Sequence, residues 1–380
     1  MVLNKKITIL QVLPDLNSGG VEKGTLEVNE YLTKKGHRSI VISNGGRMVD
    51  KLINDNGEHY KLAVGKKTFL TLFTIPKLIS FIKINKIDVV HARSRLPAWV
   101  CYFALRFVEK NIRPAFITTF HGAYSVNKYS SIMAKGDMVI VVSKTIKKYV
   151  LKNYEVDKKK LFLNYRGVSK KEFSPKYNAS REWLIKWYEE FPQTKEKIIL
   201  TIPGRITRIK GQDHFIEAID KIIKKYPNIH GLIIGEEKSK SKYMRELKDQ
   251  VTSFGLDENI TFVGHRKDVK QIMSISRLVF SLTKVPEAFG RISLESLSLG
   301  VPVIAYSHGG VKEQMSEILP EGLVSVGNIN NVAKLSFKWI NKPPVIKRNN
   351  SFTLEKMLEN TLKIYKKMVR EGKNEHCKKI

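Results

Sequence analysis

Short runs of aliphatic and β-branched residues alternate with stretches of helical length along the whole chain. In the first half, the predicted strands are residues 7–13, 39–43, 89–91, 115–120 and 138–142. In the second half, they are residues 198–202, 230–234, 260–263, 278–281, 301–306 and 323–326. The amphipathic stretches between them include residues 22–35, 72–86 and 97–108. Strands that alternate with helices pair into parallel sheets, so the pattern predicts an α/β fold.

Two domains are expected, because 380 residues exceed the usual size of a single domain. Between the two series of strands lie Ser174-Pro175 and a charged helical stretch at residues 181–190. We therefore predict one domain at residues 1–175 and a second at residues 176–350. Residues 351–380 begin as one last amphipathic helix and finish in a polar end.

The composition is that of an ordinary globular enzyme, with 42% hydrophobic and 27% charged residues. Cys101 and Cys377 lie far apart and have no metal-ligand neighbours, which favours a reducing compartment over a disulfide framework. No targeting segment is visible, and no apolar run reaches the roughly 20 residues that a membrane-spanning helix needs. A cytoplasmic protein is expected, either soluble or peripheral at a membrane.

The net charge of +31 has two interpretations. A positive field attracts nucleic acid, anionic lipid or phosphorylated substrates. Alternatively, the chain prefers lysine at indifferent surface positions, and the even spread of its lysines favours this view. No recognised nucleic-acid-binding module is present, so nucleic acid is not an expected partner. Residues 66–86 combine lysines with bulky apolar side chains, which is typical of a helix packed on its sheet or of one lying on an anionic membrane.

The first glycine-rich turn follows the predicted strand at residues 7–13 and contains Gly19-Gly20. Glycine lets the backbone approach a ligand, and a following helix presents free N–H groups to anionic oxygens. Many such turns contain glycine for geometry alone. The turn lacks the Gly-x-Gly-x-x-Gly pattern of dinucleotide-binding proteins, which disfavours a nicotinamide-dependent dehydrogenase.

A basic loop opens the second half of the chain, directly after the predicted strand at residues 198–202. It contains Arg205, Arg208 and Lys210 between two glycines. Arginine can bind two phosphate oxygens at once and lysine supplies a point charge, so the loop suits a diphosphate. Its place also fits, since ligands of open α/β sheets bind at the carboxyl ends of the strands.

The strongest local signal is a pair of carboxylates, Glu287 and Glu295, on either side of a helix that we expect to begin near Phe289-Gly290. Glu287 would lie in the loop and Glu295 about two turns into the helix, so they can contact different parts of one long ligand. Carboxylates accept hydrogen bonds from sugar hydroxyls. The chain has no Asp-x-Asp, His-x-His or His-Glu-x-x-His, so no metal site is expected.

Taken together and in this order, the motifs resemble glycosyltransferase family 4, the retaining enzymes of the GT-B fold. The resemblance covers nearly the whole chain and is carried by Gly19-Gly20, His121-Gly122, Gly204-Arg205, Lys210-Gly211, Phe262-Val263-Gly264, Glu287-x7-Glu295 and Gly300-Val301-Pro302-Val303. It implies two Rossmann-like, doubly wound domains with a cleft between them. Residues 1–175 would bind the acceptor, residues 176–350 would bind the nucleotide sugar, and the last helix would cross back to the first domain.

The resemblance also implies roles for single residues in donor binding. Arg205 and Lys210 would bind the diphosphate and stabilise it as it leaves. Glu287 would hold the transferred sugar, together with the backbone of Phe289 and Gly290. Glu295 would hold the ribose.

The remaining implied roles concern the base and the acceptor. Val263, Gly264 and His265 would meet the nucleotide base. His121 would lie beside the sugar and the acceptor as a catalytic residue, and Gly19 and Gly20 would approach the phosphates. Independently of the resemblance, His91 ends another predicted strand and is followed closely by Arg93, Ser94 and Arg95. These side chains could meet a phosphorylated or acidic acceptor.

The expected protein is thus a retaining, metal-independent glycosyltransferase of the hexosyltransferase type. It would use a nucleoside diphosphate sugar as co-substrate and no other cofactor. A glycan or lipid-linked acceptor is expected, in lipopolysaccharide or other cell-surface polysaccharide biosynthesis, with peripheral contact to an anionic membrane at its inner face. A nucleotide-sugar epimerase or a phosphorylase of the same fold is the alternative, and a basic nucleic-acid-binding protein is the alternative from another class.

Overall fold

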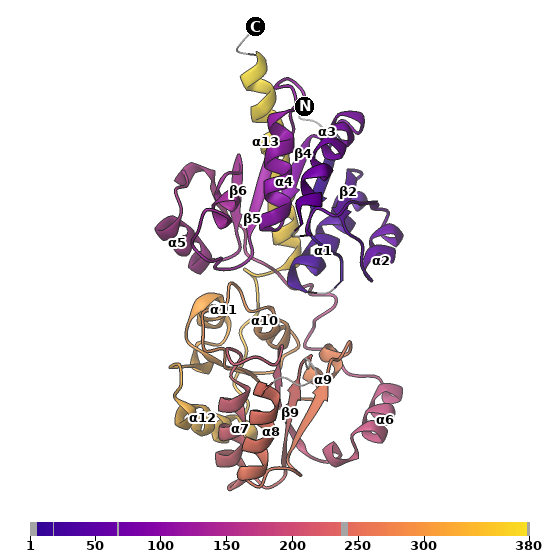
Figure 1. Ribbon diagram of the computed structural model, residues 1–380. Helices are drawn as coiled ribbons and strands as arrows, with labels where there is room; N and C mark the ends of the chain where they lie inside the picture. Colours follow the sequence, from indigo (N-terminus) through magenta and orange to yellow (C-terminus); the bar gives the residue numbers. More distant parts are fainter. Residues whose placement is uncertain (1–5, 18, 67, 237–241, 378–380) are drawn as a thin grey trace. The chain divides into compact units, whose positions relative to one another are not determined.

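The computed structural model describes residues 6–17, 19–66, 68–236 and 242–377. The chain divides into two compact units (Figure 1). The first unit comprises Met1–Tyr165 and Glu355–Ile380, and the second comprises Arg166–Leu354. The chain therefore passes into the second unit after Tyr165 rather than near residue 175.

A parallel sheet forms the centre of the first unit. Within its described residues, seven strands lie in the order β3-β2-β1-β4-β5-β6-β7. The strands are β1 (Thr8–Val12), β2 (Arg38–Ser43), β3 (Glu58–Lys61), β4 (Val89–Ala92), β5 (Ala115–Phe120), β6 (Met138–Val141) and β7 (Leu161–Leu163). The helical segments are α1 (Gly20–Lys34), α2 (Val49–Asn54), η1 (Phe69–Phe73), α3 (Thr74–Ile84), α4 (Arg95–Arg106), η2 (Ser130–Ala134), α5 (Lys144–Asn153), η3 (Lys158–Lys160) and α13 (Leu354–Cys377).

A second parallel sheet forms the centre of the second unit. In the part of this unit that the structure describes, six strands lie in the order β10-β9-β8-β11-β12-β13. The strands are β8 (Ile198–Pro203), β9 (Ile229–Ile234), β10 (Ile260–Gly264), β11 (Leu278–Ser281), β12 (Val303–Tyr306) and β13 (Leu323–Val324). The helical segments are α6 (Arg181–Glu190), η4 (Pro192–Thr194), α7 (Gln212–Ile223), α8 (Lys242–Ser253), α9 (Val269–Ser274), α10 (Arg291–Ser298), α11 (Gly309–Ile318), η5 (Pro320–Gly322) and α12 (Ile329–Asn341).

The fold thus confirms the predicted architecture of two Rossmann-like, doubly wound units. Two strands had no counterpart in the sequence prediction, β3 and β7. Three of the four residues of β3 are exposed, and β7 is only three residues long, so neither carries the long apolar run of an interior strand. Both occupy edges of the first sheet.

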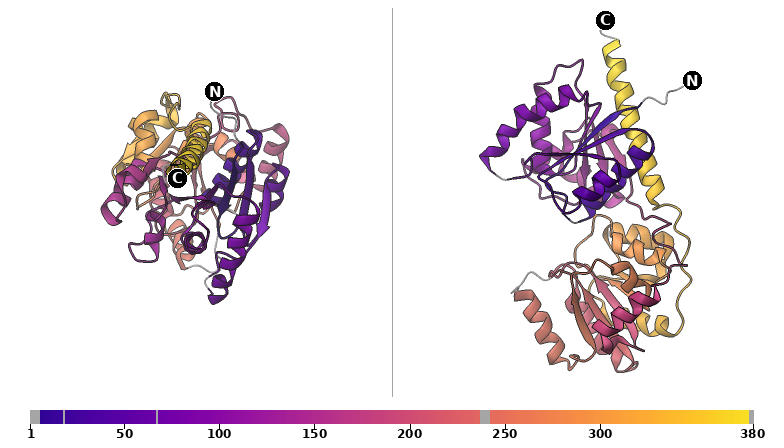
Figure 2. Two further views of the ribbon diagram at one scale, coloured as in Figure 1. Left: turned by 90° about the horizontal axis from the view of Figure 1, so that it is seen from above. Right: turned by 90° about the vertical axis from the view of Figure 1, so that its right-hand side faces the viewer.

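Helix α13 packs on the first unit, although it comes last in the sequence (Figure 2). The hydroxyl of Tyr365 lies 2.6 Å from Nδ1 of His91 on β4, and Nε2 of the same imidazole lies 2.7 Å from the hydroxyl of Thr119. Arg93 is also buried, and its guanidinium Nε donates a 2.9 Å hydrogen bond to Oε1 of Gln11. The idea that His91 and Arg93 meet an acceptor is therefore wrong, because both side chains belong to the interior of the unit.

Candidate active site

The basic loop follows β8 at the carboxyl end of the second sheet. Gly204 has a φ of 152°, and its N–H donates a 2.8 Å hydrogen bond to the carbonyl of Ile234 at the end of the neighbouring strand. The side chain of Arg205 is exposed. Its carbonyl oxygen accepts a 3.1 Å hydrogen bond from the buried amide of Gln212, the first residue of α7. This bond fixes the backbone at Arg205 and leaves the guanidinium free to meet a ligand.

An acidic loop follows β11, the next strand in the same sheet, and carries Glu287. The hydroxyl of Thr283 donates a 2.9 Å hydrogen bond to Oε1 of Glu287, and the ammonium of Lys210 forms an ion pair with the same oxygen. The side chains of Lys210 and Glu287 are 25% and 20% exposed, respectively. The structure therefore brings together two predicted site residues from different loops and leaves both accessible.

The two loops are held against each other by backbone contacts. The N–H of Lys284 donates a 2.7 Å hydrogen bond to the carbonyl of Ile209. Gly211 has a φ of 76°, and a Cβ atom there would lie 2.1 Å from the carbonyl oxygen of Leu282. Only glycine permits both this backbone conformation and this close approach. Gly211 thus sets the spacing between the basic loop and the acidic loop.

A polar cluster beside these loops was not predicted from the sequence. The ammonium of Lys284 forms an ion pair with Asp213 in the first turn of α7, and the hydroxyl of Tyr243 donates a 3.2 Å hydrogen bond to the other oxygen. Burial opposes ionisation of Asp213, but the Lys284 bond and charge outweigh it and lower its pKa. Lys284 thereby fastens the acidic loop to α7. The signal in the sequence was only an acidic residue at a helix start, which is common.

Arg208 is held away from Lys210 by partners of its own. Its guanidinium forms an ion pair with Glu246 on α8 and lies 5.0 Å from the centroid of the Tyr243 ring. Arg205 and Arg208 therefore differ in surroundings, although they lie on one loop and are both exposed.

Hydrogen bonds from the start of α11 hold the end of the acidic loop in place. The N–H of Gly310 donates a 2.8 Å hydrogen bond to the carbonyl of Glu287, and Nε2–H of His308 donates one of 2.6 Å to the carbonyl of Thr283. Gly290 directly precedes α10 with a φ of 86°. A Cβ atom at Gly290 would lie 2.3 Å from Cγ2 of Val311. The backbone around Glu287 is thus fixed on both sides.

Glu295 is the fifth residue of α10, so it lies just over one turn into the helix rather than two. Its side chain is buried, with a residue exposure of 8%, and Nε of Arg291 lies 3.4 Å from its Oε1. A buried carboxylate is costly unless it has polar partners, so the position is unusual for an ordinary helix residue. The side chain of Glu295 therefore does not face the solvent.

Three further predicted site residues, Val263, Gly264 and His265, lie at the end of β10 and just after it. Val263 is buried in a core cluster with Trp187 and Ile199, so its side chain points away from any ligand. Gly264 has a φ of 69°, its carbonyl accepts a 3.0 Å hydrogen bond from Gly235, and nothing would lie within 4 Å of an added Cβ. His265 is exposed. Open space at Gly264 and an exposed His265 are compatible with a base beside this strand end.

Three predicted site residues, Gly19, Gly20 and His121, belong to the first unit. Gly19 has a φ of 138° and directly precedes α1, which begins at Gly20, and both glycines are exposed. A Cβ atom at Gly19 would lie 2.5 Å from the carboxylate of Glu22, whose pKa is raised by burial. His121 follows β5 and is half-buried. These residues lie at the carboxyl ends of β1 and β5, where ligands of parallel sheets bind.

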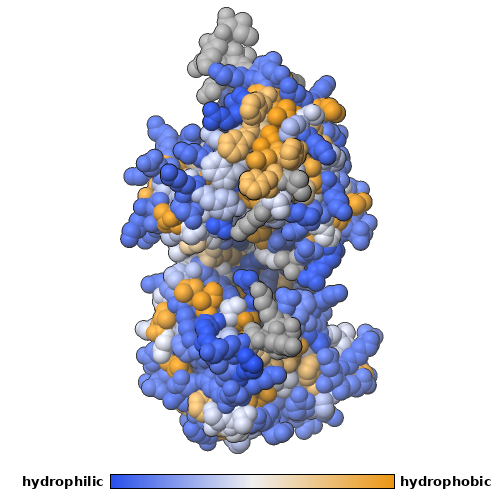
Figure 3. Space-filling view, viewed as in Figure 1, coloured by the Kyte–Doolittle hydropathy of each residue, from blue (hydrophilic) through white to orange (hydrophobic). Residues whose placement is uncertain are grey.

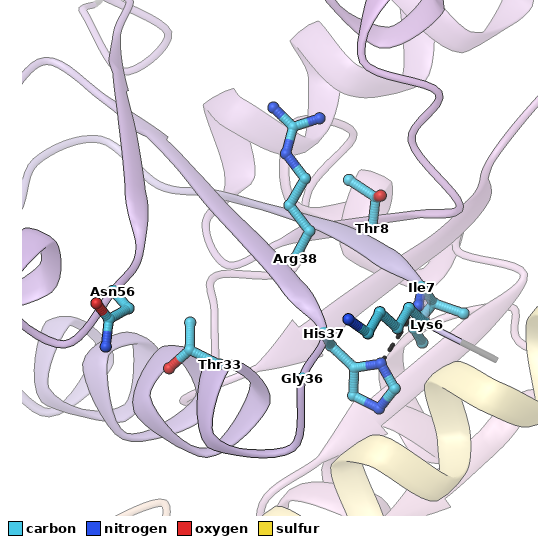
Figure 4. Close-up of a pocket in the computed structure, with 8 residues that line it drawn as sticks. All are labelled: Lys6, Ile7, Thr8, Thr33, Gly36, His37, Arg38 and Asn56. Carbon is cyan, nitrogen blue, oxygen red and sulfur yellow. Dashed lines mark hydrogen bonds between the residues drawn. The ribbon is translucent and has the colours of Figure 1, made fainter. Parts of the chain in front are cut away.

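A shallow pocket of about 360 Å³ opens at the opposite edge of the first sheet (Figure 4). Its lining residues are Lys6, Ile7, Thr8, Thr33, Gly36, His37, Arg38 and Asn56. Nδ1 of His37 accepts a 3.3 Å hydrogen bond from the N–H of Ile7, and Arg38 is paired with Glu58 at 2.7 Å. These groups satisfy one another at the amino ends of the strands, so the pocket is not part of the candidate site.

Among the described residues, no group of three or more histidine, cysteine, aspartate or glutamate side chains is arranged to hold a metal ion. In the same part of the chain, no helix combines the length and the apolar character needed to cross a membrane.

Comparisons with known proteins define the family. Residues 18–172 match the family model of Glycosyltransferase Family 4, and residues 186–362 match that of Glycosyl transferases group 1. A crystal structure of a glycosyltransferase from Rickettsia africae ESF-5 is 32% identical in sequence and superimposes with a TM-score of 0.85, covering 96% of this chain and 99% of that one.

More distant matches include a curated glycosyltransferase and a solved structure with a bound nucleotide sugar. An uncharacterized glycosyltransferase of Methanocaldococcus jannaschii is 27% identical over 319 residues, which cover 78% of each chain. The crystal structure of Anabaena HepE in complex with UDP-glucose is 18% identical, with a TM-score of 0.74 over 98% of this chain and 99% of that one.

Two Rossmann-like units, with a basic and an acidic loop at the carboxyl ends of adjacent strands, define a glycosyltransferase of the GT-B fold. The chain belongs to glycosyltransferase family 4.

Proposed function

We propose that the second unit binds a nucleoside diphosphate sugar and that the enzyme transfers the sugar, a hexose, with retention of configuration and without a metal ion. The observation that carries the proposal is the ion pair between Lys210 and Glu287 at the carboxyl ends of β8 and β11. A cation for the phosphate and a carboxylate for the sugar hydroxyls lie side by side there, as a sugar joined to a diphosphate requires.

Each group then has one part of the donor to bind. Arg205 and Lys210 bind the diphosphate oxygens, because guanidinium and ammonium groups form charge-assisted hydrogen bonds with them. Glu287 accepts hydrogen bonds from hydroxyls of the sugar, together with the backbone of Phe289 and Gly290. The buried carboxylate of Glu295 binds the ribose hydroxyls.

The base would lie against the end of β10. Val263 and Gly264 contribute through their backbone, since the side chain of Val263 is part of the core. His265 contributes through its exposed side chain. From the first unit, His121 would contact the sugar and the acceptor, and Gly19 and Gly20 would let the backbone approach the phosphates.

In the reaction, the bond between the anomeric carbon and the diphosphate oxygen breaks, and the acceptor oxygen attacks from the same face. The departing diphosphate takes the proton of the acceptor hydroxyl, so the products are the glycoside and the protonated nucleoside diphosphate. Arg205 and Lys210 stabilise the negative charge that develops on the leaving group. Such preorganised electrostatic stabilisation is often the largest single contribution to catalysis.

The identities of the donor and the acceptor have less direct support than the donor-binding residues. HepE binds UDP-glucose in its crystal structure, so a uridine diphosphate hexose is the first donor to test. The acceptor is a glycan or a lipid-linked sugar of cell-surface polysaccharide biosynthesis, such as lipopolysaccharide, and the enzyme acts in the cytoplasm at the inner face of the membrane. These assignments rest on the family resemblance.

A thermal-shift screen of uridine, guanosine and adenosine diphosphate sugars tests the donor class. A ligand at 100 times its dissociation constant adds roughly 2.7 kcal/mol to the stability of the protein, which is readily measured. We expect one base to stabilise the enzyme and the variant Glu295→Ala, which loses the proposed ribose contact, to show a smaller shift. No shift with any nucleotide sugar contradicts the proposal, and turnover of the donor without an acceptor identifies an epimerase instead.

A further inference from the structure

Large apolar side chains stand exposed on one surface of the first unit, which we call the α3–α4 surface. It consists of side chains on η1, at the end of α3 and on or just after α4, namely Phe69, Leu72, Phe73, Ile84, Phe103 and Phe107. Phe69 is 89% exposed, Ile84 78%, Phe73 72% and Phe107 69%. Apolar side chains gather over α3 and α4 in the space-filling view (Figure 3).

Other residues form the buried faces of these helices. On α3, Leu78 and Ile82 are buried, and α4 buries Ala98 and Cys101 among others. Each helix is thus apolar on the side that packs inward and carries further large apolar groups outside, where a surface helix normally carries polar residues. Single exposed apolar residues are common, whereas a contiguous group of aromatic ones marks a binding surface.

The same stretch of chain is almost free of acidic groups. From residue 62 to residue 108 the sequence contains one acidic residue, Asp88, and its Oδ2 accepts a 2.8 Å hydrogen bond from the N–H of Thr8. Lys66, Lys77 and Lys86 are exposed in the same stretch. The surface therefore presents positive charge beside its aromatic groups.

The charge and the shape of the α3–α4 surface together indicate which kind of partner it binds. The side chains of Phe69, Phe73 and Phe107 are 69% to 89% exposed, so they project from the surface rather than line a groove that could hold a peptide or a helix. Projecting aromatic groups surrounded by lysines are the composition of helices that lie in the interface of an anionic bilayer. We propose that the α3–α4 surface binds an anionic lipid bilayer, with Phe69 and Phe73 entering the interface and Lys66 and Lys77 facing the headgroups.

Cosedimentation of the full chain with vesicles measures this binding without donor or acceptor, so its outcome is independent of the proposed transfer reaction. We expect binding to phosphatidylcholine vesicles that contain phosphatidylglycerol, weaker binding at high salt, and little binding to phosphatidylcholine alone. Phe69→Ser/Phe73→Ser should lower the partition coefficient by about tenfold or more, because burying one phenylalanine side chain is worth more than a factor of ten. Lys66→Ser and Lys77→Ser should each lower it about fivefold.

Matched controls come from the second unit. Val345 is 87% exposed and Ile185 50% exposed, so Val345→Ser/Ile185→Ser removes exposed apolar groups elsewhere, and Lys334→Ser removes an exposed charge. We expect the controls to bind vesicles like the unaltered protein, and all variants to keep its melting temperature. Four outcomes overturn the proposal. They are equal binding to neutral vesicles, no binding to anionic vesicles, equal losses in the controls, and a dimer of the chain that Phe69→Ser/Phe73→Ser dissociates.

Discussion

The ammonium of Lys210 forms an ion pair with the carboxylate of Glu287, a residue 77 positions later in the chain. The pair joins the loop after β8 to the loop after β11, and both side chains remain partly exposed. Each group thus neutralises the charge of the other. We expect donor binding to exchange this single ion pair for several charge-assisted hydrogen bonds.

Arg205→Ala and Lys210→Ala should each lower kcat by about 10²–10³-fold, the usual scale for the loss of one group that stabilises developing charge. The effect should fall on kcat, because interactions that strengthen in the transition state raise turnover, whereas equal binding of ground and transition states changes only KM. Steady-state kinetics with the donor found by the thermal-shift screen measure both constants.

Arg208→Ala is the matched control for charge on the same loop. Its guanidinium is paired with Glu246 and lies over the ring of Tyr243, so its loss should leave kcat nearly unchanged. If Arg208→Ala matches the other two variants, or if all three alter only donor affinity, the loop is a general attractor of anions and the assigned mechanism is wrong.

Substitution of the two glutamates should affect different properties of the enzyme. Glu295→Ala should weaken binding of the free nucleoside diphosphate, because it removes a contact to the ribose. Glu287→Ala should leave that affinity nearly intact and reduce turnover of the whole donor, because the sugar loses its carboxylate partner. Isothermal titration calorimetry gives the affinities. Unchanged nucleoside diphosphate binding in both variants would falsify these roles.

Transfer should survive exhaustive chelation, because in the proposed mechanism Arg205 and Lys210 supply the positive charge that a divalent ion would otherwise supply. The measurement is the initial rate after dialysis against a chelator, compared with the rate after addition of magnesium or manganese. Complete loss of transfer that either ion restores would show that the diphosphate needs a metal.

Gly211→Ala should separate the basic loop from the acidic loop, because its Cβ would lie 2.1 Å from the carbonyl oxygen of Leu282. Gly255→Ala is the control, since Gly255 also has a positive φ, 64°, but has nothing within 4 Å of an added Cβ. The control should cost about 1–2 kcal/mol for the left-handed backbone, and Gly211→Ala at least about 2 kcal/mol more. Urea unfolding measures both, and equal costs would show that the close contact at Gly211 is unimportant.

Acid should destabilise the second unit through His230, which is buried on β9. Burial lowers the pKa of His230 from 6.5 to about 4, so the folded form stays neutral while the unfolded chain takes up a proton below pH 6.5. The stability is therefore complete above pH 6.5 and is lost as the pH falls towards 4, by up to about 1.4 kcal/mol per pH unit. His230→Gln should show a shallower fall in urea unfolding between pH 7 and pH 5. An identical slope in both proteins would mean that the fold does not lower the pKa of His230.

Much of the fold could be predicted because interior strands of a parallel sheet carry an unmistakable pattern. The observed bounds of β5 and α6 are those predicted, Ala115–Phe120 and Arg181–Glu190. The helix after Gly290 also begins within two residues of its predicted start. The edge strand β3 was missed because its exposed, polar residues carry no such pattern.

The sequence by itself determined the residue types of the site and their order. Glycines, cations and carboxylates follow the predicted strands, whose carboxyl ends meet at one edge of a parallel sheet. The nucleotide sugar came from the resemblance of these motifs to glycosyltransferase family 4. Only the tertiary structure decided which of these groups touch. Lys210 forms an ion pair with Glu287, whereas Arg208 forms one with Glu246. The side chain of Val263 is buried in the core, and those of Phe69 and Phe73 are exposed. The physical reason is that periodicity along a chain specifies the face of each element, whereas contacts between elements depend on how their side chains pack in three dimensions.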